Sequence, residues 1–100
     1  ATAYAASKAA VDSFTTGFAK EVAREGIRVN TVRPGVIATP MTARLQANPE
    51  RQRELENSIP LGRIGRPEEI GEVIVWLLSD KASFVSGAHV NAGGGGFLVI

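Results

Sequence analysis

Several kinds of site are excluded by what this 100-residue sequence lacks. It has no cysteine, which excludes a disulfide scaffold and a thiolate metal site and is typical of proteins in a reducing cytoplasm. The single histidine, His89, is not enough to build a zinc site. The longest apolar runs, such as residues 73–78, fall far short of the roughly 18 residues that a membrane span needs. We therefore expect no metal site and no membrane partner.

The charge is balanced. Eleven Lys and Arg residues are interleaved with ten Asp and Glu, giving a net charge of +1 without a basic stripe, so nucleic acid is not an expected partner. Apolar residues make up 44% and charged residues 21%, which is typical of a globular α/β domain. The length allows one compact unit. Because the chain opens with Ala inside a helical pattern and has no capped start, we expect it to be cut at its N-terminus.

The first half of the chain predicts a long helix followed by a strand. One apolar row over residues 3–24 recurs every four positions, which indicates a helix with one apolar face: Ala6, Ala10, Phe14, Phe18 and Val22. Gly26 is the expected helix stop. Residues 27–33 are rich in β-branched side chains and predict a buried strand, which Pro34 and Gly35 end.

The second half predicts a lid, a second helix and a second strand. Three prolines divide residues 40–66, where only NPERQRELEN (residues 48–57) favours a short amphipathic helix. Pro67 suits the first turn of a helix, with Trp76 expected in the core or at a subunit contact. A second strand is predicted over residues 88–92, parallel to the first. The helix from Pro67 is expected to bury one apolar face: Ile70, Val73, Ile74, Leu77 and Leu78.

The stretch YAASK places Tyr4 and Lys8 four residues apart, so that on a helix they share one face. An ammonium group near a phenol stabilises the phenolate by Coulomb attraction, which would make the pair useful for acid/base chemistry. The spacing alone is also compatible with two unrelated helix residues. The surrounding sequence has to decide between these interpretations.

That sequence resembles the C-terminal half of the short-chain dehydrogenases/reductases. The resemblance rests on YAASK, then GIRVNTVRPGVIATPM, then PLGRIGRPEEIGEVIVWLLSD and FVSGAHVNAGGG, and it spans nearly the whole chain. It implies an α/β fold: residues 1–100 would be one partial Rossmann-like domain, a truncated C-terminal part of a doubly wound parallel sheet with two strands and long helices. It also implies NAD or NADP as cofactor and a small-molecule alcohol or carbonyl compound as substrate.

By resemblance, Tyr4 matches the general acid/base that exchanges a proton with the substrate oxygen, and Lys8 matches the lysine that stabilises the phenolate and binds the nicotinamide ribose. The remaining matches are to cofactor-binding positions. Thr39 matches a hydroxyl residue that contacts the cofactor, and four residues match the turn beside the nicotinamide: Pro34, Gly35, Val36 and Ile37. Residues 40–66 match the variable substrate-side segment. The sequence therefore predicts a reaction type without naming a substrate.

The chain departs from the family pattern at its beginning. The glycine-rich dinucleotide fingerprint and the substrate-positioning serine of the family are not among its residues. We therefore expect a fragment of an NAD(P)-dependent oxidoreductase that is inactive alone. The alternative is a non-catalytic α/β module that associates with itself as a homo-oligomer. His89, Asn30 and Asn91 are expected to be structural, and residues 97–100 either a packed end or an artefact of termination.

Overall fold

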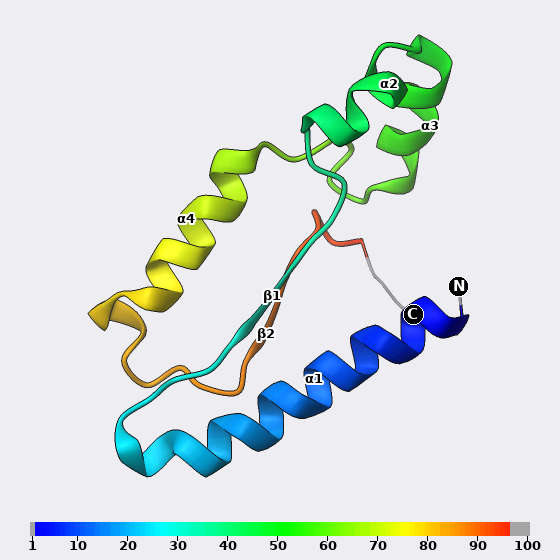
Figure 1. Cartoon of the computed structure of the whole chain (residues 1–100). Helices are drawn as coiled ribbons and strands as arrows, with labels where there is room; N and C mark the ends of the chain where they lie inside the picture. Colours follow the sequence, from blue (N-terminus) through cyan, green and yellow to red (C-terminus); the bar gives the residue numbers. More distant parts are fainter. Residues whose placement is uncertain (1, 97–100) are drawn as a thin grey trace.

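The computed structural model describes residues 2–96; residues 97–100, for which the sequence left two alternatives, lie outside the described residues. This part of the chain alternates helices with two short strands (Figure 1). Its helices are α1 (Thr2–Val22), α2 (Ala43–Gln46), α3 (Pro49–Ser58) and α4 (Pro67–Leu78), and its strands are β1 (Thr31–Pro34) and β2 (His89–Ala92). Three 3₁₀ turns complete it: η1 (Ala23–Glu25), η2 (Pro40–Thr42) and η3 (Asp80–Ala82).

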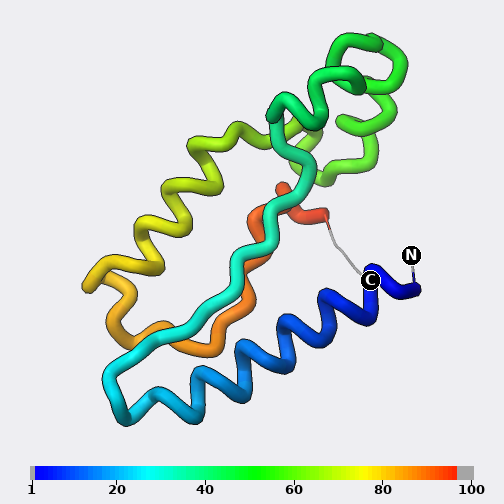
Figure 2. The backbone as a smooth tube through the Cα atoms, viewed as in Figure 1, coloured from blue at the N-terminus to red at the C-terminus, as the bar shows by residue number. Residues whose placement is uncertain are grey.

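The two strands form a parallel pair in which Thr31 is opposite His89 and Pro34 is opposite Ala92. The chain passes from β1 to β2 through α4, as parallel pairing requires. Figures 1 and 2 show both strands running between α1 and α4. The predicted α/β class, with a parallel sheet and long helices, is therefore confirmed.

Helix α1 forms where the apolar repeat predicts it, but it does not bury the predicted row. It gives way to the turn η1 and ends at Gly26, which has φ 78° and donates its N–H to the Ala23 carbonyl over 3.0 Å. The residues of α1 that are buried are Thr15 and Ala19, whereas Phe14 is 66% exposed. The buried face of α1 is therefore made of small side chains and not of its apolar row.

Strand β1 begins later than predicted, because side chains replace the ladder over residues 27–30. Ala88 donates its N–H to Asn30 Oδ1 over 2.9 Å, and Asn30 Nδ2 donates to the Val85 carbonyl over 3.1 Å. The Val29 N–H donates to the Ser86 hydroxyl over 3.1 Å. The Val29 carbonyl still accepts from the Gly87 N–H over 2.7 Å, but the regular strand register starts only at Thr31. The predicted second strand, residues 88–92, is confirmed to within one residue.

The segment over residues 40–66 contains more structure than expected. The predicted short helix is confirmed as α3, with Asn48 Oδ1 accepting from the N–H groups of Glu50 and Arg51 over 3.1 and 3.3 Å. The turn η2 and the short helix α2 precede it and were not predicted. Pro40 begins η2, where a residue without an N–H is tolerated.

Helix α4 has the predicted bounds but packs with only part of its apolar face. Leu77 is buried at 5% exposure, whereas Ile74 is 41% and Leu78 77% exposed, so the prediction of one fully buried face is wrong at those two positions. The two-stranded sheet is too narrow to cover the whole row. The search of the described helices for an apolar segment long enough to cross a lipid bilayer found none.

Candidate active site

The first two turns of α1 bring Tyr4 and Lys8 together. The Lys8 ammonium nitrogen lies 5.3 Å from the centroid of the Tyr4 ring, within the range of a cation–π contact. Tyr4 is 67% exposed. Within residues 2–96 neither the phenol oxygen nor the ammonium group makes a hydrogen bond or an ion pair. Both groups are therefore available to a ligand.

The turn after β1 is held against the turn after β2 by a close backbone approach. Gly35 donates its N–H to the Ala92 carbonyl over 3.4 Å. A Cβ atom placed on Gly35 would lie 2.7 Å from the Cα atom of Gly93. By resemblance, Gly35 belongs to the turn beside the nicotinamide, where glycine lets the backbone approach a flat ring closely. The structure shows that the neighbouring strand end already requires it.

Residues Val36 and Ile37 are fixed by a short parallel bridge to Gly65. The Val36 carbonyl accepts from the Gly65 N–H over 3.0 Å, and the Gly65 carbonyl accepts from the Ala38 N–H over 2.9 Å. The Ile37 carbonyl accepts from the Thr42 hydroxyl over 2.8 Å. The Ile37 N–H donates to no acceptor in the part of the chain that the structure describes. A rigid turn thus presents one backbone donor.

Thr39 contributes a hydroxyl group next to that donor. Its backbone N–H donates to the Thr42 hydroxyl over 3.0 Å, and its carbonyl accepts from the Thr42 N–H over 3.0 Å. The backbone of this half-buried residue is therefore fixed. Its own hydroxyl makes no hydrogen bond to any described residue, which leaves it free for a ligand.

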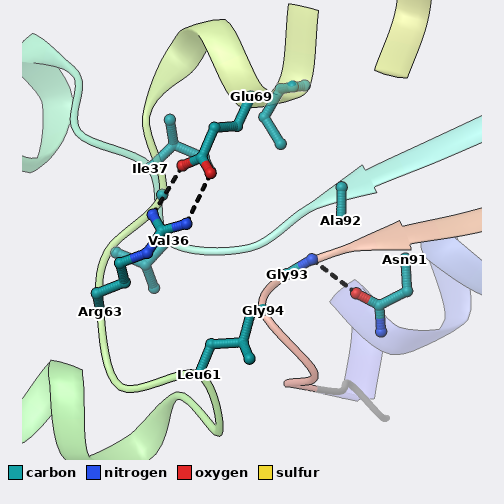
Figure 3. A pocket seen from close by; sticks show the side chains of 11 residues that line it. Val36, Ile37, Leu61, Arg63, Glu69, Asn91, Ala92, Gly93 and Gly94 are labelled. Atoms are coloured by element: carbon teal, nitrogen blue, oxygen red, sulfur yellow. Dashed lines mark hydrogen bonds and ion pairs between the residues drawn. The ribbon is translucent and has the colours of Figure 1, made fainter. Parts of the chain in front are cut away.

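A pocket of about 270 Å³ lies between the turns after the two strands and the start of α4 (Figure 3). Arg63 and Glu69 point toward one another at its edge and form a bidentate pair, Nη1 to Oε1 over 2.8 Å and Nη2 to Oε2 over 2.7 Å. The predicted residues that line it are Val36 and Ile37; the others are Leu61, Arg63, Gly65, Glu69, Ile70, Asn91, Ala92, Gly93 and Gly94.

The pair at the edge of this pocket is a feature that sequence reasoning missed. Hydrogen bonds from Arg63, together with the Arg66 N–H at 2.9 Å from Oε1, lower the pKa of Glu69 to about 2. The available signal was the spacing of Arg66, which precedes α4, and Glu69 three residues later. A carboxylate at that position commonly accepts a free N–H group at the start of a helix. That signal identifies the contact with Arg66, whereas the pairing with Arg63 depends on the loop.

The predicted site residues form two groups. Residues 34–39 make one turn where β1 ends, and Tyr4 and Lys8 lie on α1. Figure 1 shows α1 running back along the sheet, so that its N-terminal end lies toward the side where both strands end. No hydrogen bond or ion pair joins the two groups within residues 2–96.

The three residues expected to be structural all make structural contacts. Asn91 accepts from the Gly93 N–H over 2.8 Å and donates to the Gly96 carbonyl over 2.9 Å, which closes the glycine-rich turn. Asn30 holds the segment before β2, as described above. His89 Nε2 lies 3.0 Å from the Thr16 hydroxyl. These roles agree with the sequence prediction.

A parallel strand pair with α1 and α4 alongside it is typical of the Rossmann-like class of nucleotide-binding domains. The chain belongs to the short-chain dehydrogenase/reductase family: residues 1–96 match the family described as Enoyl-(Acyl carrier protein) reductase. The 3-oxoacyl-[acyl-carrier-protein] reductase of Thermotoga maritima is 53% identical over 95 residues, covering 94% of this chain and 37% of that protein.

Solved structures of dehydrogenases have a similar fold over the same segment. A 2-deoxy-d-gluconate 3-dehydrogenase described as putative, from Agrobacterium tumefaciens with bound NADP, has a TM-score of 0.83 and 40% identity and covers 92% of this chain and 37% of its own. A 4-hydroxyisoleucine dehydrogenase complexed with NADH has a TM-score of 0.87 and 35% identity, covering 94% and 39%. The chain thus spans between a third and two fifths of these proteins.

Proposed function

We propose that this chain supplies the acid/base pair and the nicotinamide-side turn of an NAD(P)-dependent oxidoreductase, which interconverts a small-molecule alcohol and the corresponding carbonyl compound. The observation that carries the proposal is a set of four polar groups without partners among residues 2–96. They are the Tyr4 phenol, the Lys8 ammonium, the Ile37 N–H and the Thr39 hydroxyl. They come from the two segments that end on the same side of the sheet (Figure 1).

The donor set fits a nicotinamide carboxamide. That group needs a hydrogen-bond donor for its oxygen, which the Ile37 N–H provides, and an acceptor for its nitrogen, which the Thr39 hydroxyl provides. When bound, the nicotinamide ring gives or accepts a hydride. The bridge to Gly65 and the contact with Gly93 hold the turn rigid, so its donors do not have to reorganise when the ligand binds.

In the proposed reaction Tyr4 acts as the general acid/base. During carbonyl reduction its phenol gives a proton to the substrate oxygen, and during alcohol oxidation the phenolate takes that proton back. Lys8 contributes a positive charge 5.3 Å from the centroid of the Tyr4 ring. Because Lys8 has no carboxylate partner among the described residues, its remaining N–H groups are free to hold a ribose hydroxyl.

The complete enzyme requires more than these 100 residues. The relatives extend well beyond the matched segment, and the glycine-rich fingerprint that binds a pyrophosphate is not among the residues of this chain. We propose that it acts together with such a portion. The reaction is therefore to be measured with a polypeptide that contains both portions.

The test is Tyr4→Phe, which removes only the hydroxyl. We expect kcat to fall by about 10²–10⁴-fold while the Kd of NAD(P)H, measured by nicotinamide fluorescence, stays unchanged. Ser13→Ala is the matched control, because Ser13 is an exposed hydroxyl residue of the same helix and makes no hydrogen bond to described residues. Turnover of Tyr4→Phe equal to that of Ser13→Ala would remove the proposed role.

The second candidate function, self-association, is favoured by an exposed aromatic pair. Phe14 and Phe18 stack with ring centroids 5.3 Å apart and are 66% and 38% exposed. Val11, on the same helix, is 48% exposed. We propose that a second copy covers this surface when the chain is alone, because exposed aromatic clusters commonly mark contact sites. Native mass spectrometry tests this: we expect dimers or larger species that Phe14→Ser weakens, whereas a monomeric chain would exclude it.

A further inference from the structure

A polar cluster outside the proposed site joins α1 to both strands. The carboxylate of Asp12, on α1, forms an ion pair with the guanidinium of Arg33 on β1. Asp12 Oδ1 also lies 3.3 Å from Nδ1 of His89 on β2. The Asp12 side chain is 25% exposed, and Oδ1 is buried without an aligned hydrogen-bond donor in the described residues. One acidic side chain thus contacts both strands.

Two hydroxyl contacts accompany this carboxylate. The Thr15 hydroxyl donates to the Val11 carbonyl over 2.9 Å. A hydroxyl has one hydrogen, so at 2.7 Å Thr15 must accept from the Thr31 hydroxyl on β1. Thr16 Oγ1 lies 3.0 Å from His89 Nε2 on β2. These contacts, together with those of Asp12, join the middle of α1 to the sheet through polar groups at defined positions.

The cluster continues the helical row that holds the proposed acid/base pair. Tyr4, Lys8, Asp12 and Thr16 follow one another at intervals of four residues along α1. Eight residues separate Tyr4 from Asp12, about 12 Å along the helix axis. The partner of Asp12 in the ion pair, Arg33, directly precedes the Pro34–Gly35 turn. A change at Asp12 would therefore move one proposed half of the site relative to the other.

We propose that Asp12 is a positioning residue, whose contacts with Arg33 and His89 fix the direction of α1 and hence the place of Tyr4 and Lys8 beside the turn after β1. This inference rests on the proposed function. Apolar packing fixes the direction of α1 less well than these polar contacts do, because the buried residues of the helix, Thr15 and Ala19, are both small. Directional polar contacts remain to fix it.

The first measurement is hydrogen exchange of the protein without cofactor. Asp12→Asn keeps the size of the side chain and removes its charge. We expect faster exchange in the first two turns of α1, because the helix is released from the sheet. The matched control is Glu21→Gln, which removes an exposed carboxylate of the same helix that has no ion pair in the described part of the chain. Equal exchange in the two variants would contradict the inference.

The second measurement is turnover of the enzyme that contains the fingerprint portion. We expect Asp12→Asn to lower kcat by about tenfold, because a small misplacement of a catalytic group costs this much or more. The effect of D₂O on kcat should rise, since proton transfer becomes slower relative to other steps. Asp12→Glu should restore part of the loss. A lower denaturation midpoint with unchanged kcat and D₂O effect would reduce Asp12 to a purely structural residue.

Tyr4→Phe, measured in parallel, separates the two proposals. If it keeps full turnover, the proposed function fails; if it loses turnover while Asp12→Asn does not, only the positioning role fails. Should Asp12→Asn not fold, Thr16→Val removes the weaker contact with His89 and is expected to shift the D₂O effect in the same direction. An unchanged D₂O effect in a folded Thr16→Val protein would then overturn the inference.

Discussion

Replacing Gly35 by alanine tests the contact that aligns the two strand ends. The new Cβ atom would lie 2.7 Å from Gly93 Cα, 3.1 Å from its carbonyl oxygen and 3.2 Å from its carbonyl carbon. All three are backbone atoms of a neighbouring turn, so no side chain can rotate away. We expect a loss of about 1–3 kcal/mol in the free energy of unfolding, as for other insertions of a methyl group into a filled space.

The assay is urea unfolding of Gly35→Ala, compared with Gly17→Ala. Gly17 lies in α1 with no atom within 4 Å of an added Cβ, so its replacement should stabilise the protein by about 0.5–1 kcal/mol. Gly93→Ala should cost less than Gly35→Ala, because its closest contact, Asn91 Oδ1 at 2.9 Å, belongs to a side chain that can move. Unchanged stability of Gly35→Ala would refute the close approach of the two turns.

Two further predictions concern the loops. The pKa of Glu69 is lowered from 4.5 to about 2 in the folded protein, so its ion pair stabilises the fold above about pH 4.5 and is lost as the pH falls toward 2. The stability difference between the wild type and Glu69→Gln should disappear over that interval in acid denaturation, whereas Glu72→Gln, at an exposed site on the same helix, should show no such change. Asn30→Ala should cost about 1–3 kcal/mol in thermal unfolding, because it leaves the Ala88 N–H without a partner and removes one of the two donors to the Val85 carbonyl, which keeps only Arg28. Asn30→Asp keeps the acceptor for Ala88 but places a carboxylate oxygen against the Val85 carbonyl, so it should lose stability as well; unchanged stability of either variant would contradict this explanation.

Local signals predicted much of the fold. Gly26 ends the first helical segment in a left-handed conformation, Pro67 begins α4, and Asn48 caps α3, all at positions where short-range chemistry decides the backbone. The parallel pairing also followed from the order of strand, helix and strand. The two helix starts and the helix end depend on residues near one another in the sequence.

Features that depend on distant contacts were not predictable in the same way. The start of β1 depends on contacts between residues more than fifty positions apart, since Val29 binds the Ser86 hydroxyl and the Asn30 side chain binds Val85. The buried residues of α1 are Thr15 and Ala19, whereas Phe14 is exposed, and the spacing of apolar residues along the helix does not tell which face is covered. Likewise, nothing in the local pattern pairs Arg63 with Glu69.

The candidate site shows the same division. The resemblance to a family named the residues of the turn, and the structure adds which of their groups are already used: the Ile37 carbonyl accepts from Thr42, while the Ile37 N–H donates to no described residue. Such a distinction needs coordinates, because a sequence does not tell which backbone groups are satisfied. The link from Asp12 to Arg33 and His89 likewise became visible only when the helix was placed on the sheet.

In the proposed function, Tyr4 and the turn at Ile37 contact one nicotinamide ligand. This proposal is tested by NMR titration of the enzyme containing the fingerprint portion with NADH and NADPH, using ¹⁵N-labelled isoleucine and tryptophan and ring-labelled tyrosine. We predict that the Ile37 amide and the Tyr4 ring shift together with the same Kd, while the indole of Trp76 does not move. Shifts at Ile37 that leave Tyr4 unchanged at saturation, or the reverse, would contradict the account.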